Sequence, residues 1–222
     1  MSMFSEKVFY LIGGPNGSGK TTLARELIND NPKIVFLNSD DVAREKNISP
    51  FDANRIIIKQ GYDIVSGHKS FALETTLAGH AHNHFIKIAK AEGYKLVFLY
   101  VFLPSVEQNI ARVRQRVALG GHDVPEEDIR RRYTRSIDNM PNVCSKADVW
   151  EIYNNGGKKC KLFMRGIHDE ATFVDDDNQE QFFKYNARML SKYLLDLANR
   201  GAASARAAAL NAGIPIVYHE SK

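Results

Sequence analysis

Residues 7–22 have the sequence KVFYLIGGPNGSGKTT, which predicts the class of fold more strongly than any other part of the chain. The apolar run at residues 8–12 is typical of a buried parallel strand. The turn after it matches Gly-x-x-x-x-Gly-Lys-Thr from Gly14 to Thr21, and residues 23–28 have the pattern of a helix. This strand–turn–helix context is the one in which the motif binds phosphate. The sequence therefore predicts a P-loop that binds a nucleoside triphosphate with magnesium; the alternative is a glycine-rich turn without a ligand.

The turn has a physical role for each kind of residue in it. Glycines let successive backbone N–H groups point at phosphate oxygens, and a helix that begins near Lys20 adds its positive end. Lys20 is expected to reach the β- and γ-phosphate oxygens, and the Thr21 hydroxyl to bind Mg²⁺. The residues expected to hold the nucleotide here are Gly14, Pro15, Asn16, Gly17, Ser18, Gly19, Lys20, Thr21 and Thr22.

Composition sets the broad class of protein. The chain has 222 residues, of which 44% are hydrophobic and 25% charged, as in an ordinary globular protein, so we expect a single α/β domain over residues 1–222. The net charge of +4 is a mild excess of basic residues, which by itself does not indicate binding to nucleic acid. Two cysteines are too few for a disulfide scaffold, and we see neither a signal peptide nor a membrane-spanning run. These features predict a cytoplasmic protein that does not contact the membrane.

Polar residues follow two further predicted strands. Residues 33–37 lead into Asn-Ser-Asp-Asp, and residues 70–73 lead into Glu74 and Thr75. In open α/β sheets ligands bind beyond the carboxyl ends of the strands, so we expect these polar groups near the P-loop.

The role of each acidic residue stays open at this point. Asp40 or Asp41 either supplies a catalytic carboxylate or caps the helix that follows. The strand period places Asn38 and Asp40 on one face, so only one of the two aspartates is expected to face the site. Glu74 either orients a substrate hydroxyl or holds a magnesium-bound water. One interpretation of the closely spaced His80, His82 and His84 is a metal site. The simpler interpretation is that these histidines lie at the start of a helix and bind no metal.

Residues 94–103 form the most apolar run and predict the central strand of the sheet. This strand ends at Pro104 rather than at an acidic pair, which argues against transport ATPases, helicases and AAA machines. Seven arginines lie on the two predicted helices that follow, from residue 105 and from residue 126. They form either two solvated basic faces or a lid, at about residues 112–136, that closes over the triphosphate.

The rest of the chain predicts the far edge of the sheet and a cover for it. Residues 148–153 are expected to be the last sheet strand, and the loop with Asn154 is expected to border the nucleotide base. Residues 158–164 and 171–174 suggest a hairpin or an edge extension. Residues 179–213 predict a helical cover over the sheet.

Six segments in a fixed order carry a resemblance to a known family. They are GGPNGSGKTT (13–22), NSD (38–40), ETT (74–76), RVRQRVALGGHDVP (112–125), RRYTRS (131–136) and YNN (153–155). With these segments the chain resembles the zeta-toxin family of P-loop kinases, in the branch whose lid carries Gly-Gly-His.

The resemblance implies ATP-dependent phosphorylation of a hydroxyl group, with Mg²⁺. Asp40 then matches the general base of the family. Glu74, with Thr75 beside it, matches the acidic residue that the family places on the substrate side of the site. Lys20, Arg116 and Arg132 match the phosphate clamps. In the toxins the acceptor is the nucleotide sugar UDP-N-acetylglucosamine, and the resemblance raises an antitoxin as a partner. Three alternatives stay open, namely a kinase of another small molecule, a kinase of a nucleic-acid end, and a nucleotide-dependent switch with weak ATPase activity.

Overall fold

The computed structural model describes residues 6–121, 123–168 and 170–174. Along the chain these residues form β1 (Val8–Gly13), α1 (Lys20–Asp30), β2 (Val35–Leu37), α2 (Ser39–Lys46), α3 (Pro50–Ser66), β3 (Phe71–Thr75), α4 (Ala81–Ala91), β4 (Lys95–Phe102), α5 (Val106–Ala118), α6 (Glu126–Cys144), β5 (Val149–Asn154), β6 (Lys161–Ile167) and β7 (Glu170–Val174). The predicted cover at residues 179–213 lies outside the described residues.

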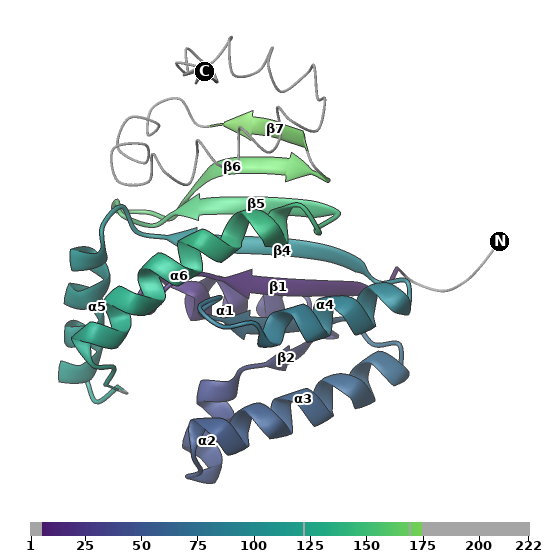
Figure 1. The fold of residues 1–222 in the computed structure, drawn as a ribbon, viewed down its shortest axis with the longest axis horizontal. Coiled ribbons are helices and arrows are strands. Elements are labelled where there is room, and N and C mark those ends of the chain that lie inside the picture. The colour runs from purple at the N-terminus through teal and green to yellow at the C-terminus, as the bar shows by residue number, and fades with distance from the viewer. Residues whose placement is uncertain (1–5, 122, 169, 175–222) are drawn as a thin grey trace, which may run out of the picture.

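The sheet has the strand order β2-β3-β1-β4-β5-β6-β7 (Figure 1). The pairs from β2 to β5 are parallel, and β6 and β7 continue the sheet as antiparallel strands. The prediction of a mainly parallel P-loop sheet flanked by helices is confirmed, and β4 lies in the centre as expected. The strand expected at residues 148–153 is confirmed as β5, and the hairpin or edge extension expected at residues 158–164 and 171–174 is confirmed as β6 and β7. The prediction that β5 is the last strand is wrong, because this hairpin pairs with it and extends the edge.

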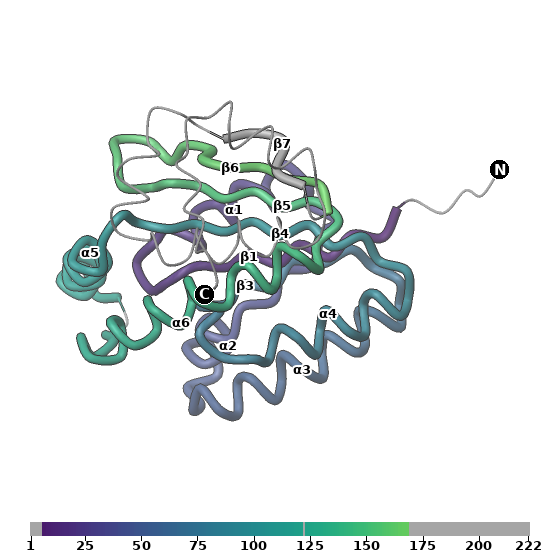
Figure 2. The backbone as a smooth tube through the Cα atoms, turned by 45° about the horizontal axis from the view of Figure 1, so that its top comes forward, coloured from purple at the N-terminus to yellow at the C-terminus, as the bar shows by residue number. Residues whose placement is uncertain are grey.

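Helices cover both faces of the sheet. α3, α4 and α6 lie on one face and α1 on the other (Figures 1 and 2). The larger core lies beneath α3, α4 and α6, where Phe9, Phe98 and Trp150 are completely buried. A smaller core beneath α1 contains Ile12 and Ala24. No helix among the described residues combines the length and the apolar character needed to cross a bilayer.

Local sequence signals set the starts of several helices. Ser49 caps α3, because its side-chain oxygen accepts a hydrogen bond from the backbone N–H of Asp52 at 3.1 Å. Pro50 occupies the first turn, where no hydrogen-bond donor is needed. α1 differs, because its N-cap is Gly19 and no side chain caps it. The first N–H groups of α1 therefore remain available to an anion.

Gly14 lies at the start of the P-loop, where the turn leaves no space for a side chain. Its φ of 144° suits glycine, and an added Cβ would lie 2.1 Å from the carbonyl oxygen of Val101 on β4. We expect Gly14→Ala to lower the free energy of unfolding by at least about 2 kcal/mol, since strain and a backbone clash combine. Urea unfolding measures this. Gly79→Ala is the control, because no atom lies within 4 Å of a Cβ there, and a change of about 0.5 kcal/mol or less is expected. Equal losses in the two variants would contradict the tight-turn explanation.

Candidate active site

A cavity of about 800 Å³ lies at the carboxyl ends of β1 and β3. Its lining brings together the residues expected from the sequence to have catalytic or metal roles, which are Lys20, Thr21, Asp40, Glu74, Arg116 and Arg132. Asp40 comes from the first turn of α2, and Arg116 and Arg132 come from α5 and α6. Residues from five separate elements therefore face the same space as the P-loop.

The P-loop itself has the chemistry of a phosphate site. Gly17 and Gly19 have positive φ angles of 76° and 101°, which curl the backbone around the cavity. Two buried side-chain atoms in the loop, Asn16 Oδ1 and Ser18 Oγ, have no hydrogen-bond partner among the described residues. The N–H groups at the uncapped start of α1 fit a polyphosphate ligand, whereas Asn16 Oδ1 is an acceptor and cannot hydrogen-bond a phosphate oxygen.

Lys20 is a buried cation beside two carboxylates. It is 6% exposed, and its Nζ donates a hydrogen bond to the carbonyl oxygen of Pro15 at 2.9 Å. Burial lowers the pKa of Lys20 below its ordinary value, while Glu74 and Asp40 partly oppose this shift. A phosphate group on the loop would add negative charge next to Lys20 and favour its charged form.

Glu74 joins the P-loop to the start of α2. Thr21 Oγ1 donates to one carboxylate oxygen of Glu74 at 2.9 Å, and Asn38 Nδ2 donates to the other at 3.1 Å. Burial raises the pKa of Glu74, and the charge of Lys20 is the main opposing influence. In P-loop NTPases an acidic side chain and the P-loop Ser or Thr together hold Mg²⁺, so this contact favours the magnesium role of Glu74 over the substrate role.

The turn after β2 differs from the sequence prediction. The chain becomes helical at Ser39, so the strand period does not apply and Asn38 and Asp40 do not share a strand face. Neither aspartate caps α2, because Asn38 Oδ1 accepts the backbone N–H of Asp40 at 2.9 Å. Asp40 lines the cavity, whereas Asp41 pairs with Arg44. Asn38 was expected near the P-loop, but the sequence prediction missed its role as the cap of α2 and its hydrogen bond to Glu74, although its type suits a cap at this position.

α5 is held against the P-loop. Asn109 Nδ2 donates to the carbonyl oxygen of Asn16 at 2.6 Å, and Arg112 donates to that of Asn155 at the same distance. A Cβ on Gly17 would lie 2.8 Å from the carbonyl oxygen of Asn109. The base of the predicted lid is therefore packed on the nucleotide loop.

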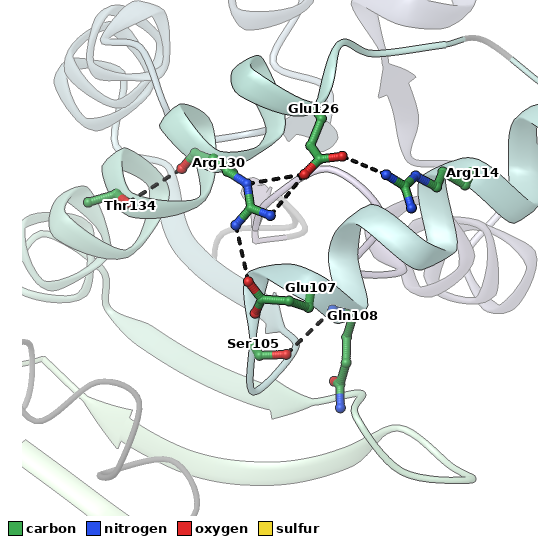
Figure 3. Close-up of polar contacts among 7 residues, drawn as sticks. All are labelled: Ser105, Glu107, Gln108, Arg114, Glu126, Arg130 and Thr134. Atoms are coloured by element: carbon green, nitrogen blue, oxygen red, sulfur yellow. Dashed lines mark hydrogen bonds and ion pairs between the residues drawn. The ribbon is translucent and has the colours of Figure 1, made fainter.

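Most of the arginines on α5 and α6 have acidic partners. Glu126 pairs with Arg114 at 2.6 Å and with Arg130 at 2.8 Å, and Arg130 also reaches Glu107 at 3.1 Å (Figure 3). This network joins the two helices. On α6, Asp128 pairs with Arg131 at 2.6 Å and Arg132 at 3.2 Å. Of the seven arginines, those that line the cavity are Arg112, Arg116 and Arg132.

At the end of β5, the residue that lines the cavity is Asn155 rather than the predicted Asn154. Asn154 is 8% exposed, and its Oδ1 accepts the backbone N–H of Gly156 at 2.9 Å. Asn155 lines the cavity instead, and its Nδ2 donates to the carbonyl oxygen of Ser18 at 2.8 Å. The strand continues to Asn154, one residue beyond the predicted end, so the next residue is the one that turns toward the P-loop.

Two other predicted groups have defined positions. Thr75 lines the cavity, but its hydroxyl oxygen accepts the backbone N–H of Leu77 at 3.1 Å. His82 is buried in the cavity wall, whereas His80 is exposed. Within the described part of the chain, no group of three or more His, Cys, Asp or Glu residues is arranged to hold a metal ion.

A family model described as an AAA domain matches residues 9–136, which is more than half of the chain. The chain belongs to this AAA-domain family. A curated relative from Haemophilus influenzae, described as an uncharacterized protein, is 35% identical over 136 residues, which are 59% of this chain and 94% of the relative. The family match reaches from β1 into α6 and therefore includes the P-loop, Asp40, Glu74 and the cavity arginines.

The sequence argument from Pro104 concerned AAA machines, which carry an acidic pair at the end of the central strand. That inference examined the end of β4, where no acidic pair follows. In the structure, β1 has β3 as its other neighbour, and β3 carries Glu74 close to its end. An acidic residue therefore does accompany the P-loop, on the adjacent strand.

Solved structures with the same fold include two complexes. The AvrRxo1-ORF1:AvrRxo1-ORF2 complex with sulphate ions matches with a TM-score of 0.64 and 14% identity, over 81% of this chain and 63% of the matched chain. This chain thus spans less than two thirds of that protein. The PezAT chromosomal toxin-antitoxin system of Streptococcus pneumoniae matches with a TM-score of 0.56 and 16% identity, over 90% of this chain and 87% of the other. At these identities the likeness shows a shared fold.

Proposed function

We propose that this chain is an ATP- and Mg²⁺-dependent kinase that transfers the γ-phosphate to a hydroxyl group of a small molecule. The observation that carries the proposal is the cavity that Asp40 shares with Lys20. A carboxylate facing the phosphate end of a P-loop is positioned to accept a proton from an acceptor hydroxyl. A nucleotide-dependent switch needs no such base, so this placement favours transfer over switching.

The nucleotide is held by the backbone of the loop from Gly14 to Thr22 and by Lys20. The uncapped start of α1 and the positive φ angles of Gly17 and Gly19 support this assignment. Thr21 and Glu74 would hold Mg²⁺, which when bound neutralises charge on the phosphate oxygens. Lys20 supplies a fixed positive charge where negative charge develops.

The remaining roles belong to residues opposite the loop. Asp40 orients the acceptor hydroxyl and takes its proton. Arg116 and Arg132 face the same cavity from the lid at about residues 112–136, where guanidinium groups suit phosphate oxygens. In this proposal residues 1–222 act as one kinase domain.

The proposal also names a candidate substrate and a candidate partner. The sequence segments shared with zeta toxins support UDP-N-acetylglucosamine as a candidate acceptor and an antitoxin as a candidate partner. The fold shared with PezAT, a toxin-antitoxin system by its description, agrees with this choice at the level of architecture.

An isotope experiment tests the proposed reaction whatever the acceptor is. The protein is incubated with Mg²⁺, ATP labelled with ¹⁸O in the γ-phosphate, and a bacterial small-molecule extract, and a second reaction receives UDP-N-acetylglucosamine alone. We expect mass spectrometry to find labelled phosphate on an organic hydroxyl compound. Label that appears only in inorganic phosphate would contradict the kinase proposal and support a switch with ATPase activity.

A further inference from the structure

Two side-chain amides from outside the P-loop bind its backbone carbonyls. Asn109 Nδ2, on α5, donates a hydrogen bond to the carbonyl oxygen of Asn16 at 2.6 Å. Asn155 Nδ2, directly after β5, donates to the carbonyl oxygen of Ser18 at 2.8 Å. Backbone carbonyls inside a protein need such partners, so these two bonds determine the course of the loop between residues 16 and 18.

The two bonds also determine the direction of backbone N–H groups. The described chain has no cis peptide bond, and in a planar trans peptide unit the N–H points opposite to the carbonyl. The carbonyl of Asn16 shares its peptide unit with the N–H of Gly17, and that of Ser18 shares its unit with the N–H of Gly19. Both glycines line the cavity. An amide that binds the carbonyl therefore orients the N–H on the other side of the same unit.

Asn109 is an unfavourable residue for packing alone. It is completely buried, and although its Nδ2 binds the loop, its Oδ1 has no hydrogen-bond partner among the described residues. A buried oxygen without a partner destabilises the folded state, and an apolar side chain that filled the space would avoid this cost. The bond from Nδ2 to the loop is therefore the feature that explains an asparagine at this position.

α5 supports Asn109 rigidly. A Cβ on Gly17 would lie 2.8 Å from the carbonyl oxygen of Asn109 and 3.2 Å from Val113 Cγ2, so the helix lies directly against the loop. Val113 is 1% exposed and belongs to a small core that also contains Ile129 of α6. The amide of Asn109 thus reaches the loop from a helix that is itself packed in place.

The backbone of Asn155 is fixed on both sides. Its N–H donates to the carbonyl oxygen of Phe102 at the end of β4 at 3.0 Å, and its own carbonyl oxygen accepts a hydrogen bond from Arg112 of α5 at 2.6 Å. Its Nδ2 lies where a Cβ on Gly19 would be, so the amide packs directly on the loop. Asn155 is therefore a second rigid support, two residues along the loop from the first.

We propose that Asn109 and Asn155 are positioning residues that hold the P-loop in its nucleotide-binding shape before ATP arrives. Each acts through the backbone of the loop and orients one N–H group toward the phosphates. A loop that is ordered in advance loses less conformational freedom on binding, so its affinity for the nucleotide is higher. This inference rests on the proposed function, because it assumes that the loop binds ATP.

Truncation of each amide tests the proposal through binding. Asn109→Ala and Asn155→Ala remove the donors to the carbonyls of Asn16 and Ser18. We expect calorimetric titration of the whole chain with AMP-PNP and Mg²⁺ to show about tenfold weaker binding in each variant. Such a loss corresponds to a loop that adopts its binding shape in only about a tenth of the molecules.

Asn139→Ala is the matched control for these variants. Asn139 Nδ2 on α6 donates to the carbonyl oxygen of Leu77 at 2.8 Å, which is the same kind of bond but outside the P-loop. We expect the urea midpoints of the three variants to lie within about 0.5 M of one another, since each loses one amide–carbonyl bond. The control should bind AMP-PNP as the unmodified chain does.

Hydrogen exchange examines the loop without any ligand. Mass spectrometry of the ligand-free chain follows the peptide that covers residues 13–22. We expect this peptide to exchange at least about fivefold faster in Asn109→Ala and Asn155→Ala than in the unmodified chain, because the loop opens more often. The Asn139→Ala control should leave its exchange unchanged.

Two results would overturn the positioning role. One is unchanged AMP-PNP affinity and loop exchange in the folded variants; the other is an equal loss in Asn139→Ala, which would indicate a general effect of lower stability. If Asn109→Ala fails to fold, Asn155→Ala decides the matter, because Asn155 is only half-buried. Failure of the unmodified chain to bind AMP-PNP would instead contradict the proposed kinase function, while the exchange measurement would still show whether the amides hold the loop.

Discussion

We expect Lys20→Ala to lower kcat for phosphate transfer by about 10³-fold, because it removes the buried cation at the phosphate end of the cavity. Glu74 and Asp40 would then face the phosphates without the positive charge that now partly balances their own. ATP binding is expected to weaken as well, since in the proposed mechanism Lys20 contacts the nucleotide before and during transfer. Steady-state kinetics with a coupled ADP assay and calorimetric titration of ATP measure the two effects separately.

The variant is expected to stay folded. Burial lowers the pKa of Lys20, which means that the folded state disfavours its charged form, so removing the side chain does not remove a net stabilising charge. Lys59→Ala is the matched control, because Lys59 is an exposed lysine of α3 outside the cavity lining. Full turnover by a folded Lys20→Ala protein would exclude Lys20 from the phosphate cradle.

For Asp40→Asn we expect ATP affinity to be nearly unchanged and kcat to fall by about 10²- to 10⁴-fold. Asparagine keeps the size and the hydrogen-bonding oxygen of the side chain but cannot take a proton from the acceptor. The fall should appear in kcat and in kcat/KM alike, which is the signature of a group that acts in the transition state.

The neighbouring carboxylate gives a close control for this variant. Asp41→Asn removes the ion pair with Arg44 but leaves the cavity lining unchanged, so its kcat is expected to match that of the unmodified protein. Exposed pairs of this kind contribute little to stability. If the two variants were equally active with the true acceptor, Asp40 would not be the base.

Several parts of the site were accessible from sequence because their signals are local. The P-loop, the strand before it and the start of α1 were predicted within a residue or two. The positions after predicted strands indicated Asp40, Asp41 and Glu74, and the resemblance to zeta toxins then favoured Asp40 as the base. The same argument from strand ends failed to predict the backbone conformation of the turn after β2. The cap role of Asn38 was missed because the strand period was extended past Leu37, where the chain has already turned into α2.

The contacts of the arginines are a second feature of the site that the sequence did not predict. A cluster of seven residues predicted a lid that contacts phosphate, yet most members pair with Glu107, Glu126 or Asp128 on the same two helices. The acidic partners are visible in the sequence, but the pairings depend on how α5 and α6 cross. Asn155 replaced Asn154 for a related reason, since one extra residue in β5 changes which side chain turns toward the loop.

The sequence by itself determined the phosphate-binding turn, because contiguous residues build it and the φ angles that glycine permits are a local property. Only the tertiary structure decided that β3 lies beside β1, which brings Glu74 within hydrogen-bonding distance of Thr21 across 53 positions of the chain. It also decided which arginines face the cavity and that His82 is buried in its wall. These contacts join residues that are far apart in sequence, so they depend on the order of the strands and the packing of the helices. No local sequence pattern determines the strand order or the helix packing.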